Sequence, residues 1–121
     1  MNEIEKGILL SIISYERNND YEISVKLKFP TSFIGFKGHF PDMPILPGIC
    51  KIKTVLFLAE ILFAKKFTLK KIVQAKFNSI VLPDELICVD CKGYLQSEGH
   101  YLIKGDFMRD NKKISIVKIE V

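Results

Sequence analysis

The chain has 121 residues, 48% of them hydrophobic and 26% charged, which is an ordinary globular composition with room for one domain over residues 1–121. Its 18 basic and 14 acidic side chains leave a net charge of +4. No basic run is interleaved with aromatic residues, which argues against nucleic acid, whereas the small positive surplus suits an acidic protein partner.

Targeting and membrane segments are not evident in the sequence. The apolar run 8–13 is shorter than the core of a signal peptide, and it follows two glutamates instead of a basic segment. The apolar stretch 49–64 is too short, and too interrupted by lysine, for a membrane span. Three cysteines, an odd number, predict no disulfide framework. We therefore expect a cytoplasmic protein.

The first 30 residues predict a hairpin. Residues 7–15 are rich in β-branched side chains and indicate a strand, and residues 17–20 form a turn cluster. Residues 21–29 alternate between apolar and polar side chains, which is the pattern of a half-buried antiparallel strand. Pro30 ends this strand. The expected buried face consists of Tyr21, Ile23, Val25, Leu27 and Phe29.

A proline-rich loop and a long apolar helix come next. Four of the five prolines lie between residues 30 and 47, so the loop 31–48 is stiff. The helix expected over residues 49–64 would be about 24 Å long, and a helix so apolar must be buried on nearly all sides. His39 precedes it, and we expect the chemistry at that point. The polar side chains of the helix are Lys51, Lys53, Thr54 and Glu60.

The second half of the chain predicts four strands, over residues 69–77, 86–95, 100–108 and 113–121. Short turns between successive strands favour antiparallel neighbours. We expect an α+β fold in which a curved antiparallel sheet wraps around one long central helix.

Cys88 and Cys91 have the spacing of a metal-binding or redox pair. They fall within a predicted strand, where side chains three residues apart point to opposite faces. We therefore expect small, buried, apolar side chains. The sequence shows no metal site and implies no cofactor.

The loop 38–48, which reads GHFPDMPILPG, resembles the signature of the 3-hydroxyacyl-[acyl-carrier-protein] dehydratases of the FabZ and FabA type, and most of all the shorter ApeI-like dehydratases of aryl polyene synthesis. Residues 75–77 and 81–86, AKF and VLPDEL, are similar to a strand and loop of that family, and Tyr101, Lys104 and Gly105 also fit. The resemblance extends from about residue 20 to the end and implies a hotdog fold.

Dehydration of a 3-hydroxyacyl thioester requires a base, an acid and a group that stabilises an enolate-like oxygen. The resemblance implies that His39 is the base and that backbone N–H groups at Gly48 polarise the thioester. A helix N-terminus offers free donors and partial positive charge, which supports that role. A histidine on its own would more often brace a turn, as we expect for His100. Further substrate contacts are expected from Phe40, Leu46, Pro47, Ile49 and Phe57.

The acid is the departure from the family pattern. The dehydratases carry glutamate or aspartate fourteen residues after the histidine, where this chain has Lys53. An ammonium group with a lowered pKa can also donate a proton, and a nearby cation would keep His39 neutral. Glu60 or Asp42 are weaker alternatives, since Glu60 lies about 10.5 Å along the helix. An ion pair between Lys53 and Glu60 across a dimer would be purely structural.

The resemblance also implies a homodimer, because each site combines the histidine loop of one subunit with the helix of the other; a trimer of dimers is a further option. The substrate would arrive on acyl-carrier protein, for which Lys51, Lys65, Lys66, Lys70 and Lys71 offer positive charge unless they are simply solvated. We expect either a dehydratase or a non-catalytic hotdog subunit that binds acyl-carrier protein or acyl chains, or pairs with an active paralogue. A thioesterase is the weakest interpretation, since the helix lacks a nearby carboxylate.

Overall fold

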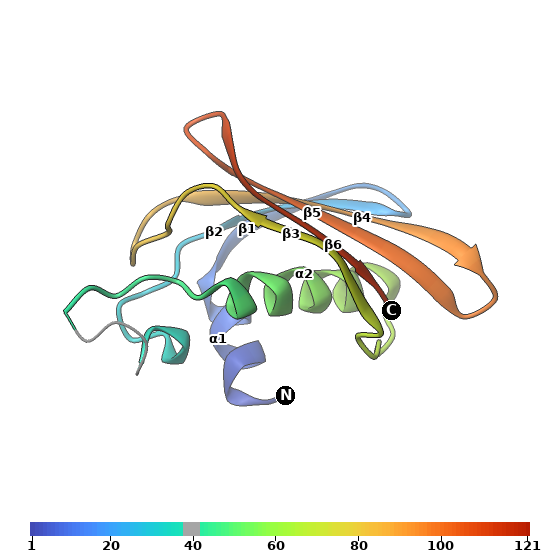
Figure 1. Ribbon diagram of the computed structural model, residues 1–121, viewed down its shortest axis with the longest axis horizontal. Helices are drawn as coiled ribbons and strands as arrows, with labels where there is room; N and C mark the ends of the chain where they lie inside the picture. The colour runs from blue at the N-terminus through green and yellow to red at the C-terminus, as the bar shows by residue number, and fades with distance from the viewer. Residues whose placement is uncertain (38–41) are drawn as a thin grey trace.

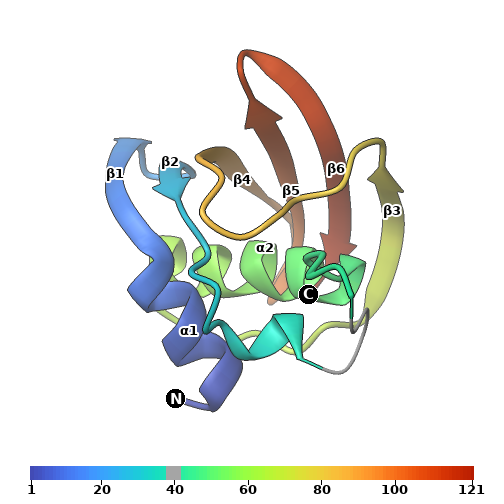
Figure 2. The ribbon, with the colours of Figure 1, turned by 90° about the vertical axis from the view of Figure 1, so that its left-hand side faces the viewer.

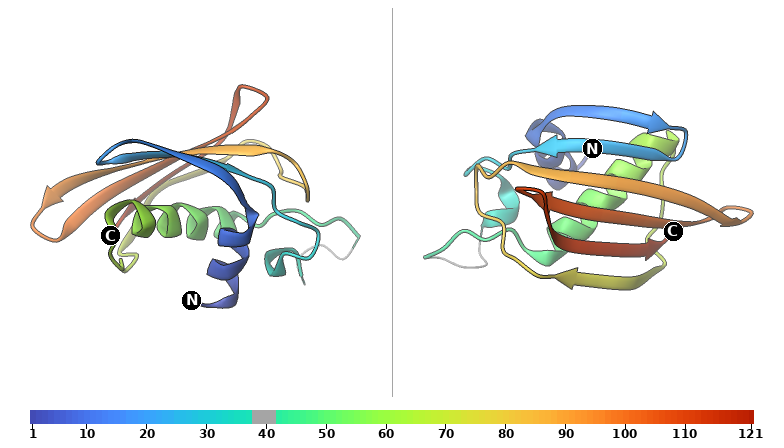
Figure 3. Two further views of the ribbon diagram at one scale, coloured as in Figure 1. Left: turned by 180° about the vertical axis from the view of Figure 1, so that it is seen from behind. Right: turned by 90° about the horizontal axis from the view of Figure 1, so that it is seen from above.

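The long helix α2, Gly48–Phe63, lies along the concave face of a curved, six-stranded antiparallel sheet (Figure 1). This arrangement is seen in a computed structural model that describes residues 1–37 and 42–121. The strands lie in the order β1-β2-β4-β5-β6-β3, and α2 crosses them at an angle on one side (Figure 3). The predicted α+β architecture is confirmed.

The element bounds follow the predicted pattern from residue 21 onward. The remaining elements are α1 (Glu3–Ser11), β1 (Ile12–Asn19), β2 (Glu22–Leu27), a 3-10 turn (Ile34–Phe36), β3 (Lys71–Phe77), β4 (Ile87–Ser97), β5 (His100–Arg109) and β6 (Lys112–Glu120). The helix prediction was wrong by one residue at each end.

Strand β2 shows the alternation that the sequence predicts. Ile23, Val25 and Leu27 are buried against the core, as is Phe29 just beyond the strand. Tyr21 precedes the strand and is exposed, so its assignment to the buried face was wrong.

The N-terminal strand predicted over residues 7–15 was wrong, because residues 3–11 form α1 and β1 begins at Ile12. A capping box starts the helix: the Asn2 side chain accepts a hydrogen bond from the Glu5 N–H (2.8 Å), and the Glu5 carboxylate accepts one from the Asn2 N–H (3.2 Å). The apolar residue Ile8 is fully buried, so tertiary packing outweighs its β propensity.

Helix α2 contacts the sheet closely. A Cβ atom on Gly105 of β5 would overlap the side chain of Val55, so only glycine allows this approach. On the other side, α1 covers part of α2, and the 3-10 turn approaches α2 at Cys50 (Figure 2). Ile49, Lys53 and Ile61 remain exposed in the single chain, so the helix is not buried on all sides.

Cys88 and Cys91 point to opposite faces of β4, as predicted, and all three cysteines are free. Cys91 is fully buried, which raises the pKa of its thiol to about 12. Cys88 is only half-buried. Across residues 1–37 and 42–121, no helix has the length and apolar character needed to cross a membrane.

Candidate functional site

The first turn of α2 is built by the Pro47–Gly48 step. Pro47 is the N-cap residue, in extended conformation, and its carbonyl accepts a hydrogen bond from the Cys50 N–H at 3.0 Å. The preceding residue, Leu46, is buried and donates its N–H to the carbonyl of Val81 at 2.8 Å. These contacts fix the entry to the helix, where the first N–H groups have no intrahelical acceptor.

Phe77, at the end of β3, packs directly on this turn. A Cβ atom on Gly48 would overlap the Phe77 ring, so glycine is required for this contact. A pocket of about 160 Å³ opens beside it. The pocket is lined by Ile45, Leu46, Gly48, Lys51, Phe77, Asn78, Ser79 and Ile80.

Lys51 reaches the same pocket from the end of the first helical turn, with only 2% of its surface exposed. Its ammonium group donates hydrogen bonds to the Ser115 hydroxyl (2.9 Å) and the Ser79 carbonyl (3.2 Å), and lies 5.0 Å from the Phe77 ring centroid. Burial, and secondarily the positive charge of Arg109, lower the pKa of Lys51 to about 8.

This burial corrects the expectation that Lys51 belongs to a solvated basic surface. Sequence reasoning missed the residue as part of the site. The available signal was its position three residues after Gly48, on a helix face that is otherwise apolar.

Lys53 is exposed and lies in a second pocket, of about 290 Å³. Glu5, Glu60 and Lys66 line the same pocket. In the part of the chain that the structure describes, no carboxylate lies within 4.0 Å of the Lys53 ammonium group. In a single chain, the Lys53 ammonium group is therefore in contact with solvent, and the Glu5 and Glu60 carboxylates lie in the same pocket.

Glu60, a weaker alternative for the acid, has a structural role here. Its carboxylate accepts a hydrogen bond from the Phe67 N–H at 2.9 Å and lies 4.0 Å from the Lys66 ammonium group. Asp42, the other alternative, is exposed in the loop. Neither carboxylate lines the pocket at the first turn of α2.

The predicted substrate-binding residues divide between two places. Leu46 and Gly48 line the first-turn pocket, whereas Phe57 is buried and lines the pocket of Lys53. Ile49 is exposed and lines neither of these two pockets. His39 and Phe40 lie outside the described residues.

Strand β3 forms the edge of the sheet next to the first-turn pocket. All seven of its residues are exposed, including Ile72, Val73 and Phe77. The opposite edge strand, β1, is also exposed over most of its length. Between β1, α1 and α2 lies an apolar groove of about 820 Å³, whose lining includes Leu9, Ile13, Tyr15, Leu58 and Ile61.

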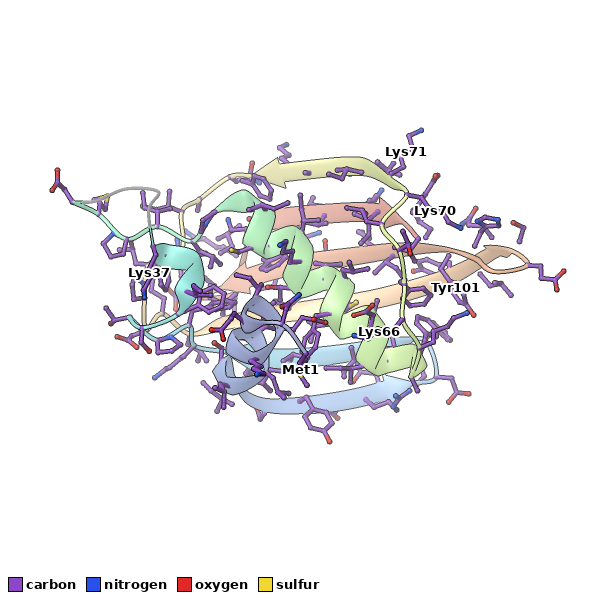
Figure 4. All side chains as sticks on the ribbon, turned by 90° about the horizontal axis from the view of Figure 1, so that it is seen from below. Met1, Lys37, Lys66, Lys70, Lys71 and Tyr101 are labelled. Atoms are coloured by element: carbon purple, nitrogen blue, oxygen red, sulfur yellow. The ribbon has the colours of Figure 1, made fainter. Side chains whose placement is uncertain are left out.

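The remaining lysines of the predicted basic surface lie beyond the C-terminal end of α2. Lys65 lies 5.5 Å from the ring centroid of Phe67 and 5.3 Å from that of Tyr101. Lys66 pairs with Glu5 at 3.4 Å. Figure 4 shows Lys66, Lys70 and Lys71 toward the end of the molecule away from Lys37. This end is about 24 Å from the first turn of the helix.

Metal ligands do not cluster in the described ranges, where no group of three or more His, Cys, Asp or Glu side chains is placed to hold an ion. The arrangement at the first turn is therefore one of backbone donors, a buried ammonium group and apolar walls.

Several curated dehydratases are similar in sequence. The chain is 31% identical over 77 residues to the 3-hydroxyacyl-[acyl-carrier-protein] dehydratase FabZ of Xanthomonas campestris, covering 54% of this chain and 50% of that protein. It is 36% identical over 62 residues to FabZ of Rickettsia felis, covering 45% and 43%. The chain thus spans about half the length of these relatives, or somewhat less.

Solved structures share the fold. The dehydratase heterocomplex ApeI:P from Xenorhabdus doucetiae superposes with a TM-score of 0.75 at 24% identity, covering 90% of this chain and 94% of that one. A thioesterase from Pseudomonas aeruginosa superposes with a TM-score of 0.67 at 13% identity, covering 95% and 82%. These likenesses establish the hotdog fold.

The family match covers most of the chain. Residues 15–113 match the ApeI-like family, described as ApeI dehydratase. This range includes most of β1, all of β2 to β5 and α2, and the whole first-turn pocket. By this match and by its fold, the chain belongs to the ApeI-like family of hotdog dehydratases.

Proposed function

We propose that this protein removes water from a 3-hydroxyacyl thioester, with the thioester carbonyl bound at the first turn of α2. The observation that carries the proposal is the pocket in which the Gly48 backbone, the Leu46 side chain and the Phe77 ring converge at the helix N-terminus. Helix N-termini stabilise negative charge, and dehydration develops such charge on the carbonyl oxygen.

The proposed base is His39, which the family motif places nine residues before Gly48. It takes the proton from C2, and the electrons of that C–H bond move toward the carbonyl to give an enolate. These electrons then form the C2–C3 double bond while the C3–O bond breaks. The hydroxyl group leaves as water with a proton from Lys53, the residue at the family's acid position.

The acyl chain is proposed to contact Phe40, Leu46, Pro47, Ile49 and Phe57, and acyl-carrier protein is the proposed carrier of the substrate. Leu46 and Phe57 line different pockets in one chain, and in this proposal a second subunit joins them into one binding surface. Lys65, Lys66, Lys70 and Lys71 lie at the far end of α2, so in an antiparallel dimer they would serve the site of the partner.

The proposed homodimer forms through β3. This edge strand carries exposed apolar side chains and ends at Phe77, against the first-turn pocket. An exposed apolar edge is a template for pairing with another strand. A trimer of dimers would use a second surface, and the apolar groove between β1, α1 and α2 offers one.

The test is hydration of a trans-2-enoyl thioester by the purified protein, followed by loss of ultraviolet absorbance. His39→Ala, Lys53→Glu and Lys53→Met are compared with His100→Ala, which removes the other histidine. We expect turnover in the wild type and in His100→Ala, loss of at least about 100-fold in His39→Ala, and a reduced rate in Lys53→Met. Absence of turnover on both acyl-carrier-protein and coenzyme A thioesters would contradict the proposal.

A second candidate is a non-catalytic hotdog subunit that binds acyl-carrier protein or an acyl chain, or pairs with an active paralogue. The observation that favours it is Lys53, an exposed cation at the position where the family carries its acid. The related Xenorhabdus structure is a heterocomplex, which makes a paralogous partner a reasonable choice for testing. A wild-type protein without dehydratase activity, together with an active Lys53→Glu variant, would support this candidate. Native mass spectrometry with acyl-carrier protein would then measure binding.

A further inference from the structure

Lys51 is a buried cation without a charged partner among the described residues. Its two hydrogen-bond acceptors, the Ser79 carbonyl and the Ser115 hydroxyl, are both uncharged. No salt bridge to Lys51 is present in the described ranges 1–37 and 42–121. A buried charge is normally paired, because removal of an ion from water is costly.

Its position makes the positive charge still more costly. Lys51 lies in the first turn of α2, where the helix dipole is itself positive and favours anions. Among the described residues, the charged side chain that acts on it is Arg109 of β5, also a cation. The other described residues that line the pocket, from the loop before α2 and from the end of β3 onward, are uncharged, as is Ser115 of β6. Burial, dipole and like charge therefore all oppose the ammonium form.

A purely structural role does not require this charge. The same space, against the Phe77 ring and the wall of β6, would accept an apolar side chain such as methionine, which has a similar length. The position of Lys51 is explained if a negative charge forms in the pocket during the reaction. The Lys51 ammonium group, the helix dipole and Arg109 would then all stabilise that negative charge.

The geometry provides for such an interaction. Lys51 and Gly48 line the same pocket of about 160 Å³, and the Phe77 ring contacts both of them. An ammonium group has three donors, and Ser79 and Ser115 accept two of them. The pair of acceptors fixes the ammonium group beside the helix N-terminus.

We propose that Lys51 supplies the fixed positive charge that stabilises the enolate oxygen formed at the first turn of α2. This inference rests on the proposed dehydratase function and adds to it a residue that the family motif does not contain. When the proton leaves C2, the carbonyl oxygen gains negative charge opposite Lys51. When the double bond forms and the hydroxyl group leaves as water, that charge is lost again, so the interaction strengthens only along the reaction path.

The kinetic test compares Lys51→Met and Lys51→Arg with Lys118→Met. Lys118 is a matched control, because it is a half-buried lysine on β6 that points to the opposite face of the sheet from Ser115. We expect Lys51→Met to lower kcat about 100-fold with little change in KM, Lys51→Arg to recover part of the loss, and Lys118→Met to resemble the wild type. Circular dichroism of each variant establishes that it is folded.

The pH profile separates this role from a structural one. Wild-type kcat is expected to fall as the pH rises through about 8, where Lys51 loses its proton, and this step should be absent from the residual activity of Lys51→Met. A folded Lys51→Met variant with wild-type kcat, or with the same pH step, would overturn the inference.

A second measurement does not depend on turnover. The lysine ε-carbon resonances are followed by NMR in wild-type protein while sodium acetate, a planar anion small enough for the pocket, is titrated against a sodium chloride control of equal ionic strength. We expect acetate, and not chloride, to raise the pKa of Lys51 by at least half a unit. An unchanged pKa overturns the charge-stabilising role, whereas a raised pKa without any turnover in the kinetic test overturns the dehydratase proposal alone.

Discussion

The ring of Phe77 occupies the space that a side chain on Gly48 would need, so the end of β3 and the start of α2 are in direct backbone-to-ring contact. Gly48→Ala is therefore expected to displace the ring and to lower the free energy of unfolding by about 1–3 kcal/mol. Urea denaturation measures this change. In a Phe77→Leu background the same substitution should cost less than half as much, and equal costs in the two backgrounds would contradict the contact.

The pH dependence of stability should contain a contribution from Lys51. Its pKa is lowered from 10.5 to about 8 in the folded chain, so between these values the unfolded chain holds a proton that the folded chain has released. Stability therefore rises with pH across this window, and below about pH 8 the charged form opposes folding throughout.

The Lys51→Met variant isolates this contribution, because the other titrating groups are common to both proteins. We expect the wild type to gain on the order of 2 kcal/mol relative to Lys51→Met between pH 7 and pH 10. Urea midpoints at four or five pH values would measure it. A constant difference over that range would mean that Lys51 is solvated in solution.

The two exposed edges of the sheet should differ in their effect on assembly. If β3 forms the dimer, Ile72→Lys combined with Val73→Lys should yield a monomer by analytical ultracentrifugation, because lysine on an edge strand opposes pairing. Ile13→Lys combined with Tyr15→Lys, on β1, is the matched control and should leave the dimer intact. The reverse outcome would place the dimer interface at β1.

We expect Glu60 to have a structural role and not a catalytic one. Glu60→Ala removes the acceptor of the Phe67 N–H and is expected to lower stability by about 1 kcal/mol. Glu60→Gln keeps an oxygen at this position and removes the acidic proton, so it should retain both stability and wild-type kcat. A large loss of kcat in Glu60→Gln would instead identify this carboxyl group as the missing acid.

Local sequence patterns predicted most of the fold. The period-2 alternation of β2 and the short turns between β4, β5 and β6 depend on neighbours a few residues apart, so they could be recognised without a structure. The N-terminal helix could not be recognised in this way, because its capping box lies before a β-branched run that favours a strand. The packing of Ile8 against the core favours the helix over the strand.

The site was predicted less completely, because part of it depends on residues that are far apart in the sequence. Gly48 and Leu46 belong to one short motif and share one pocket. The burial of Lys51, by contrast, depends on Ser115, which is 64 residues away in the chain and is brought close by the pairing of β3 with β6. The apolar helix face around Lys51 is a local signal of burial, but no local pattern shows that its ammonium group meets Ser115.

The strand order also has a consequence for how the chain folds. Strands β4, β5 and β6 pair with their sequence neighbours through tight turns, whereas β2 joins β4 by pairing Leu27 with Ile87, and β3 joins β6 by pairing Phe77 with Ser115. The chain segments between β2 and β4 and between β3 and β6 are longer, and closing a longer loop costs more conformational entropy. We therefore expect the β4-β5-β6 meander to form in the folding transition state, so that core substitutions there slow folding, while those in β2 chiefly accelerate unfolding. The pocket at the first turn of α2, which needs β3 in place, would be among the last parts of the molecule to assemble.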